Sequence, residues 1–259
     1  MKAWTSRQPR WRATSRLPSH VARSGDGWIH PGAKVDPTAH VCPGAVVCDG
    51  AVVGPHVHVG AGSVVGTHAR VGRGTKIGFN VCLDHCSIGE ECVLHNGVCV
   101  GQDGFGFYVD EGGNVVKKPQ ELRVVVGNHV EIGANTCVDR GSWRDTVIGD
   151  HCKIDNLVQM GHNAVLGKAC ILCGQTALGG SSNLGDYVVM GGKSAVADHI
   201  NVVSKVRLAA KAGVIKDITM PGDYAGFPAM PAQEWRKMQV RIRQIHKKKH
   251  THHDHTYGH

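Results

Sequence analysis

Aromatic residues are scarce in this sequence: Phe, Trp and Tyr together make up 5% of its 259 residues. No uninterrupted apolar stretch approaches the roughly 18 residues of a membrane-spanning helix, so we expect no transmembrane segment. The 10 Pro residues follow no Gly-X-Y period, which excludes a collagen-like chain. Among the 10 Cys residues, Cys170 and Cys173 form a lone CxxC pair without the second pair of a zinc finger. We therefore expect reduced, packed thiols and no metal site.

Acidic residues are absent from the first 25 positions, which contain six Lys or Arg. Residues 234–259 hold seven basic and two acidic residues, so the two ends carry the formal charge of +8 and the body between them is slightly acidic. Nucleic-acid binding requires a basic patch on the folded body, and we therefore do not expect a nucleic-acid partner.

The two ends also have distinctive patterns. Residues 1–27 are predicted to be a transit peptide or disordered leader, because they are rich in Arg and Ser and lack the apolar core of a secretory signal. The predicted destination is the mitochondrial matrix, with a plastid as the alternative. Residues 219–259 are predicted to form a C-terminal extension with a basic amphipathic helix and a His-rich tail. The helix is indicated by the spacing of Trp235, Met238, Ile242 and Ile245.

Glycine is abundant, at 35 residues, and it accompanies an internal repeat. From Ile29 every sixth residue is aliphatic over ten successive positions, and after slips and an interruption the same period continues to Val214. The next residue is often Gly, which suits a corner where a side chain would collide with a neighbouring turn. Three six-residue sides make an 18-residue coil. The sequence therefore predicts an all-β fold, a parallel β-helix of the hexapeptide type over residues 28–218.

The largest interruption of the period is residues 101–125, which we expect to leave the prism as a loop. Loops ejected from a regular scaffold commonly carry function. Flat-sided prisms associate side by side, and closed symmetry favours a homotrimer with functional sites between subunits.

A polar cluster around His162 is the strongest candidate site. Five polar residues lie within nine positions: Asp155, Asn156, Gln159, His162 and Asn163. A step of one coil places Gly180 over His162, and the next step reaches Asp198, beside His199. A His that accepts a proton and a bare backbone N–H that binds an oxyanion are the groups that acyl transfer needs. A solvated surface His is the alternative interpretation.

Residues 101–167, with the strings DRG, DTVIG and DNLVQMGHN, resemble the UDP-3-O-acylglucosamine N-acyltransferase family of lipid A biosynthesis. The similarity continues through GDYAGFPAMPAQEWRK at 222–237, and the leader makes the chain look most similar to plant mitochondrial members. The resemblance implies a left-handed β-helix and a homotrimeric enzyme. It implies transfer of a 3-hydroxyacyl chain from acyl carrier protein to the 2-amino group of UDP-3-O-acylglucosamine. No dissociable cofactor is implied, because the phosphopantetheine arrives on the carrier protein.

The family's site residues can be placed on this sequence one by one. Its proton-accepting His falls on His162, its oxyanion-binding amide on Gly180, and its second active-site His on His199. The positions that match polar groups around the sugar and acyl chain are Asp155, Asn156, Gln159 and Asn163. We expect the acidic carrier to dock on a surface formed by the C-terminal helix with Lys205, Arg207, Lys211 and Lys216. The alternative is that these charges form a solvated rim.

One departure from the family and three alternatives bear on the substrate. Bacterial members carry an N-terminal domain that holds the uridine, whereas the repeat here begins near Trp28. We therefore expect the prism and the 101–125 loop to hold the uridine, or the substrate to differ.

The alternative functions are the related O-acyltransferase, a γ-type carbonic anhydrase with zinc held by three His of adjacent subunits, and a non-catalytic trimeric scaffold. The DRG and GHN strings argue against the first.

Overall fold

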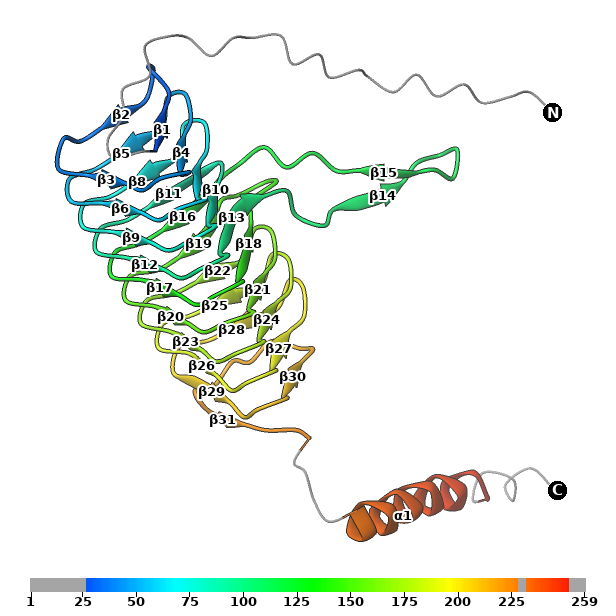
Figure 1. Cartoon of the computed structure of the whole chain (residues 1–259). Helices are drawn as coiled ribbons and strands as arrows, with labels where there is room; N and C mark the ends of the chain where they lie inside the picture. Colours follow the sequence, from blue (N-terminus) through cyan, green and yellow to red (C-terminus); the bar gives the residue numbers. More distant parts are fainter. Residues whose placement is uncertain (1–26, 228–231, 252–259) are drawn as a thin grey trace.

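The computed structural model describes residues 27–227 and 232–251. Its body is a three-sided prism in which the chain coils repeatedly through three parallel sheets (Figure 1). The sheets contain 10, 9 and 10 strands, and each strand pairs in parallel with its counterpart one coil further along. This confirms the predicted fold class, the left-handed parallel β-helix built on a hexapeptide repeat.

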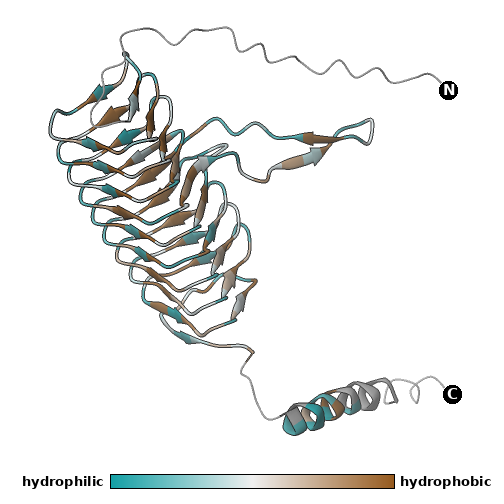
Figure 2. Cartoon of the chain, viewed as in Figure 1, coloured by the Kyte–Doolittle hydropathy of each residue, from teal (hydrophilic) through white to brown (hydrophobic). Residues whose placement is uncertain are grey.

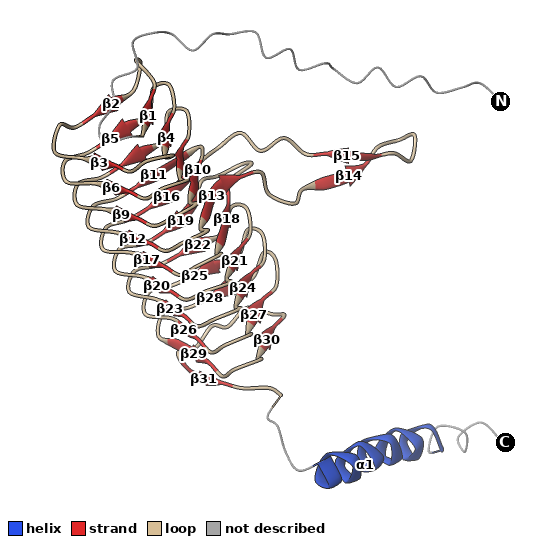
Figure 3. Cartoon of the chain, viewed as in Figure 1, coloured by secondary structure: helices blue, strands red, loops and turns tan. Residues whose placement is uncertain are grey.

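Most strands span only two residues, with turns between them (Figure 3). The first sheet consists of β1 (Trp28–Ile29), β4 (Val46–Val47), β7 (Val64–Val65), β10 (Cys82–Leu83), β13 (Cys99–Gln102), β18 (Cys137–Asp139), β21 (Gln159–Met160), β24 (Ala177–Leu178), β27 (Ala195–Val196) and β30 (Gly213–Val214). The second consists of β2 (Lys34–Val35), β5 (Val52–Val53), β8 (Arg70–Val71), β11 (Cys86–Ile88), β16 (Val124–Val126), β19 (Thr146–Ile148), β22 (Val165–Leu166), β25 (Asn183–Leu184) and β28 (Asn201–Val202). The third consists of β3 (His40–Val41), β6 (His58–Val59), β9 (Lys76–Ile77), β12 (Val93–Leu94), β17 (Glu131–Ile132), β20 (Lys153–Ile154), β23 (Ile171–Leu172), β26 (Val189–Met190), β29 (Val206–Leu208) and β31 (Gly222–Tyr224).

The core is the axis of the prism, filled by the side chains of the six-residue repeat. Every residue of that repeat is buried except Val35, which is partly buried against the same core. In β25, for example, Asn183 points outward and is exposed, whereas Leu184 is 1% exposed. Figure 2 shows hydrophobic residues along many of the prism strands. Side chains alternate between the two faces of a strand, so one aliphatic residue per side is enough to fill the interior.

The glycines at the corners are explained by close approach between coils. A Cβ on Gly60 would lie 2.2 Å from the carbonyl oxygen of Gly78 in the next coil. The left-handed backbone conformation occurs two residues after these glycines; Asn80, two residues after Gly78, has φ 55°. The predicted collision is therefore confirmed at the glycines that follow inward side chains, while the left-handed position accepts other residue types.

Buried thiols act as small donors at these corners. Cys92, Cys152 and Cys170 donate to carbonyl oxygens of Gly127, Gly167 and Gly185 at 3.2, 3.0 and 3.2 Å. All ten Cys residues are free, and Cys86 is buried as well. The expectation of packed thiols is confirmed for these four. Cys82 is exposed on the first sheet, because its side chain occupies the outward position of β10, so the expectation was wrong for this residue.

Cys86 is expected to resist alkylation in the folded protein. Burial, together with the charge of Asp84, raises the pKa of the Cys86 thiol to about 12, and only the thiolate reacts. Iodoacetamide at pH 8 should therefore label Cys86 after unfolding in guanidinium but not before, as read by peptide mass spectrometry. Equal labelling rates in the native and unfolded chain would contradict the packing of this corner.

The expected loop at 101–125 leaves the prism as a hairpin (Figure 1). Its antiparallel strands are β14 (Phe107–Val109) and β15 (Val115–Lys117).

The C-terminal helix is confirmed as α1 (Ala232–Thr251), with Met238 and Ile242 exposed. The described residues do not include the leader, the His-rich tail beyond residue 251, or the side chains of Trp235 and Ile245. Within residues 27–227 and 232–251, no helix is both long and apolar enough to span a bilayer.

Candidate functional site

His162 lies in the turn between β21 and β22, at the corner where the first sheet meets the second. Met160 before the turn and Ala164 within it are both buried. These inward side chains fix the turn and leave the partly buried imidazole on its outer side.

Asn163 orients the imidazole of His162. It is fully buried and has a left-handed backbone with φ 63°, which Asn tolerates better than most residues. Its Nδ2 donates to the carbonyl oxygen of Arg144 at 2.7 Å, so its Oδ1 must face the opposite way. Oδ1 accepts hydrogen bonds from His162 Nδ1 at 2.7 Å and from Ser142 Oγ at 2.9 Å. The neutral imidazole therefore carries its proton on Nδ1, and Nε2 is a proton acceptor.

Gly180 faces the ring of His162 from the next coil. A Cβ at this position would lie 2.8 Å from Cε1 and 2.9 Å from Nε2 of His162, so the ring has room only because Gly180 has no side chain. The carbonyl oxygen of Gly180 accepts a hydrogen bond from the N–H of His199 at 2.9 Å. Its own N–H has no hydrogen-bond partner among the described residues.

The N–H at this turn position is capped by a side chain of the next coil in some coils, whereas at Gly174, Gly180 and Gly192 it has no partner among the described residues. At the equivalent turn position of another coil, the N–H of Ala134 donates to the side chain of Asn156 in the coil that follows, at 2.7 Å. The N–H of Lys168 is capped by a side chain in the same way. The residue placed to cap Gly180 is Asp198, which forms no such bond in the described structure. An unpaired N–H beside a proton acceptor is suited to binding an oxyanion.

Asp139 is a buried carboxyl group beside this corner. Its Oδ1 accepts a hydrogen bond from Gln102 Nε2 at 2.8 Å, and its Oδ2 accepts one from Gln159 Nε2 at 3.1 Å. Burial raises the pKa of Asp139, whereas the two amide donors and the nearby His162 oppose the rise. The Gln159 amide thus helps to hold Asp139 in place.

The base of the hairpin covers His162. A Cβ on Gly104 would lie 2.7 Å from Cβ and 2.9 Å from Cδ2 of His162, and 3.1 Å from Oε1 of Gln120. Gln120 is 6% exposed, and its Nε2 donates to the carbonyl oxygens of Lys118 and Pro119. Its buried Oε1 has no hydrogen-bond partner. An acceptor is therefore left unsatisfied within a few ångströms of the imidazole.

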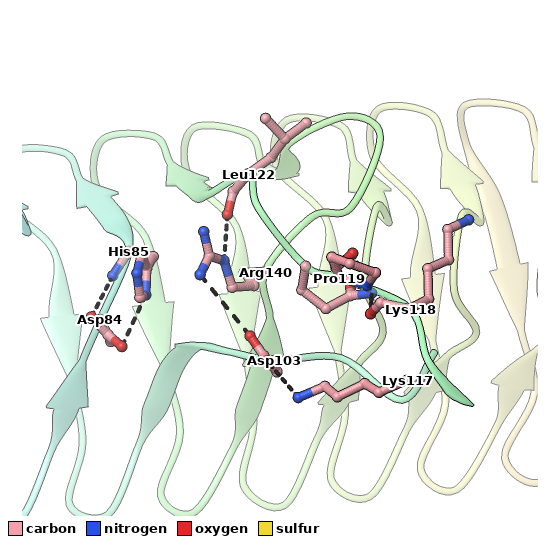
Figure 4. A network of polar contacts seen from close by, with 9 residues as sticks. Asp84, His85, Asp103, Lys117, Lys118, Pro119, Leu122 and Arg140 are labelled. Carbon is pink, nitrogen blue, oxygen red and sulfur yellow. Dashed lines mark hydrogen bonds and ion pairs between the residues drawn. The ribbon is translucent and has the colours of Figure 1, made fainter. Parts of the chain in front are cut away.

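Polar contacts fasten the two ends of the hairpin to the prism (Figure 4). Asp103 pairs with Lys117, and Arg140 Nη1 lies 4.0 Å from Asp103 Oδ1. Arg140 Nε also donates to the carbonyl oxygen of Leu122 at 2.6 Å. Arg140 is 9% exposed whereas the Asp103 side chain is 43% exposed, so only the guanidinium side of this contact is shielded from water.

A second insertion, residues 139–145, ties together the two turns of the site. Arg144 Nε donates to the carbonyl oxygen of Asn163 at 2.8 Å, and its Nη2 donates to that of Ser181 at 3.1 Å. The Arg144 guanidinium lies 4.7 Å from the centroid of the Trp143 ring, whose Nε1 donates to Ser181 Oγ at 3.3 Å. These contacts hold adjacent coils at a fixed separation.

His199 lies in the turn after β27 and is exposed, with a left-handed backbone at φ 60°. Its N–H bonds to the Gly180 carbonyl, but no hydrogen bond in the described structure joins its imidazole to that of His162. The structure thus brings together His162, Asn163 and Gly180, with Gln159 alongside, and places His199 on the open side of the same corner.

Asp155 and Asn156 lie at a different corner, where the third sheet meets the first. Asp155 Oδ1 accepts a hydrogen bond from the N–H of Asn156 at 2.7 Å. Both line a hollow of about 590 Å³, whose other polar walls are His95, Asn96, Glu131 and Lys153. Within one chain both residues therefore lie apart from His162, because six residues along this repeat span a whole side of the triangle; their predicted place around the substrate stays a prediction.

The four basic residues expected to form a docking surface are exposed near the C-terminal end of the prism: Lys205, Arg207, Lys211 and Lys216. Arg207 is already paired with Asp223, through Nε–Oδ1 at 2.5 Å and Nη2–Oδ2 at 2.7 Å. This pairing raises the pKa of Arg207 and lowers that of Asp223. Arg207 therefore offers less free charge than its sequence position suggested.

Comparisons with known proteins find relatives for most of the prism. A protein named probable UDP-3-O-acylglucosamine N-acyltransferase 2, mitochondrial, from Arabidopsis thaliana is 58% identical over 170 residues, covering 66% of this chain and 56% of that protein. A UDP-3-O-acylglucosamine N-acyltransferase from Bradyrhizobium sp. (strain BTAi1) is 56% identical over 158 residues, covering 61% and 44%. The chain thus spans about half the length of these curated relatives. No protein-family model matches it.

Solved structures share the fold. A UDP-N-acetylglucosamine acyltransferase from Francisella novicida has a TM-score of 0.57 and 21% identity, over 82% of this chain and 73% of that one. The corresponding protein from Campylobacter jejuni has a TM-score of 0.56 and 23% identity, over 73% and 68%. The curated relatives confirm the resemblance to the UDP-3-O-acylglucosamine N-acyltransferases, and the structures confirm the hexapeptide-repeat fold.

Proposed function

We propose that this chain is an N-acyltransferase that moves a 3-hydroxyacyl chain from acyl carrier protein to the 2-amino group of UDP-3-O-acylglucosamine. The observation that carries the proposal is the pairing of a proton-accepting Nε2 on His162 with an unpaired N–H on Gly180. The names of the curated relatives supply the substrate class.

In the proposed mechanism, the amine nitrogen of the sugar attacks the thioester carbonyl carbon while Nε2 of His162 takes the proton that the amine loses. The carbonyl oxygen becomes an oxyanion and accepts a hydrogen bond from the Gly180 N–H. When the intermediate collapses, the C–S bond breaks and the imidazolium returns its proton to the departing sulfur. The products are an amide and the free thiol of the carrier, and His162 is neutral again.

Asn163 is a positioning residue in this mechanism. Because its Oδ1 holds the proton of Nδ1, it keeps Nε2 available for the amine and stabilises the imidazolium after proton transfer. His199, on the open side of the corner, is proposed to contact the thioester end of the donor.

Gln120 is proposed to bind the substrate through its unpaired Oε1, which can accept a hydrogen bond from an amine or hydroxyl group. Replacing Gln120 with Met, which has a similar size, is expected to raise KM about tenfold with a smaller change in kcat, since one hydrogen bond to substrate is lost. Steady-state kinetics measure this split. Gln175→Met, at an exposed turn, is the control; a Gln120→Met enzyme with unchanged KM would remove Gln120 from the substrate site.

The proposed assembly is a homotrimer. Asp155 and Asn156 lie at a corner separate from His162, so in this proposal they line the site from a neighbouring protomer. Light scattering of the purified protein measures the mass directly, and a monomer that is fully active would contradict the shared site.

The carrier is proposed to dock on Lys205, Lys211 and Lys216, which are exposed.

Mitochondria are the proposed location, supported by the name of the Arabidopsis relative. Import of the radiolabelled chain into isolated mitochondria and into plastids distinguishes the two destinations.

The decisive assay combines the purified chain, 3-hydroxyacyl carrier protein and UDP-3-O-acylglucosamine, and detects the N-acylated sugar by mass spectrometry. A parallel reaction uses the same acylated sugar without the UDP group. Product from the UDP-sugar supports the proposal, and product only from the free sugar would change the substrate class. No product from either sugar would overturn the proposed reaction.

A further inference from the structure

A cluster of metal-ligating side chains lies on the third sheet, near the N-terminal end of the prism. His40 in β3 and His58 in β6 are register partners on adjacent parallel strands, and both side chains point outward and are exposed. Their rings are stacked, with centroids 5.2 Å apart and an interplanar angle of 19°.

Cys42 supplies a third ligand from the corner that follows β3. Its Sγ lies 3.6 Å from Nε2 of His58, and one ligand atom from each of the three residues lies within 4.8 Å of the others. Gly60, one coil beyond Cys42, has no side chain to fill this corner. The cluster is the one grouping of at least three His, Cys, Asp or Glu ligands found among the described residues.

The distances suit a tetrahedral metal. With bonds of about 2.3 Å to sulfur and about 2.05 Å to nitrogen, two ligands of a tetrahedral zinc ion lie about 3.6 Å apart. The Sγ–Nε2 separation already matches this edge. One ring nitrogen of His40 lies within 4.8 Å of the other two ligand atoms, so the exposed His40 imidazole must move from its stacked position to complete the set.

We infer that His40, Cys42 and His58 form a binding site for a thiophilic divalent ion of the zinc class, with water in the fourth position. Two imidazoles and a thiolate form a donor set that favours Zn²⁺ over Mg²⁺ or Ca²⁺, which prefer oxygen. Binding deprotonates Cys42 and releases the proton to solvent. Lys76, in register with His58 on β9, is the nearest cation along the strand face, and its long side chain can extend into solvent.

The site would fasten the first coils of the prism to each other. Among the described residues β3 belongs to the first coil of the prism, so a metal that bridges β3 and β6 would tie this coil to the next one. It is separate from His162, which lies several coils further along the same prism, and it does not depend on the proposed acyl transfer.

Cobalt substitution tests the site in the full-length chain. Reduced protein freed of metal by a chelator is titrated with Co²⁺, and a thiolate-to-cobalt charge-transfer band in the near ultraviolet is expected to saturate at one ion per chain and to disappear when Zn²⁺ is added. Any Co²⁺ held only by imidazoles, including those of the His-rich tail, gives no such band. The readout therefore isolates sites that contain a thiolate.

Three variants complete the experiment. Cys42→Ser should abolish the band, and His58→Ala should weaken Co²⁺ binding at least tenfold, whereas Cys48→Ser, at another corner of the prism, should leave both unchanged. Circular dichroism checks that each variant is folded. No band in the wild-type protein, or a band that survives in folded Cys42→Ser, would overturn the inference.

Discussion

Replacing His162 with Ala is expected to lower kcat/KM for acyl transfer by about 10²–10⁴-fold while leaving the prism folded. The side chain is partly buried at an outer corner and contributes nothing to the aliphatic axis, so its removal deletes the proton acceptor without opening the core. Initial rates with acyl carrier protein and the UDP-sugar measure the loss, and circular dichroism with thermal unfolding checks the fold.

His151→Ala is the matched control for this measurement. His151 is likewise a turn residue, although it is exposed, and its ring stacks on that of His129 with centroids 4.9 Å apart, at a corner away from His162. Its replacement should leave the rate near that of the wild type. If His162→Ala were as active as His151→Ala, the assignment of the proton acceptor would be wrong.

Gly180→Ala is expected to lower kcat about 100-fold, the second largest effect. The backbone of Gly180 is not left-handed, so Ala is compatible with the turn. Its Cβ would nevertheless lie 2.8–2.9 Å from ring atoms of His162, which forces the imidazole to move by a few tenths of an ångström or more. The added methyl group then disturbs both the proton-accepting imidazole of His162 and the access of the oxyanion to the Gly180 N–H, although no catalytic atom has been removed.

Gly192→Ala separates this effect from a general cost of adding a methyl group. Gly192 occupies the equivalent turn position two sides further along the repeat than Gly180, and a Cβ there would meet only the carbonyl oxygen of Gly174, at 3.5 Å. We expect wild-type kinetics from this variant. Full activity in Gly180→Ala would show that the close contact with His162 is not needed for the reaction.

The architecture follows from the sequence because a β-helix repeats one local rule. An inward aliphatic residue at every sixth position determines which side chains fill the axis, and a coil of 18 residues determines which residues stack. The same arithmetic places Gly180 against His162, and the structure confirms that contact. It also places His40 against His58 one coil later, but the repeat alone does not show that Cys42 approaches this pair from the corner.

The period could not locate residues whose positions depend on breaks in the repeat. Gln120 returns to His162 only because the hairpin folds back across the corner, and Arg144 reaches Asn163 from an insertion of its own. The one available signal was the DRG string, which marked the neighbourhood of Asp139 without showing what the carboxyl contacts. Closeness in sequence also did not show that Asp155 and Asn156 lie at another corner than His162 within one chain, because a triangular coil turns a corner between them.

The sequence by itself therefore determined the solenoid, its axis and the stacking of His162 with Gly180, since these depend on a short-range repeat. Tertiary structure alone decided which nitrogen of His162 accepts a proton, through Asn163 and the carbonyl of Arg144. It also decided that the Gly180 N–H is uncapped and that the hairpin base covers the ring. These features depend on contacts between residues far apart in the sequence, such as Asn163 with Arg144 and Gly104 with His162, and no local pattern encodes the direction of such contacts.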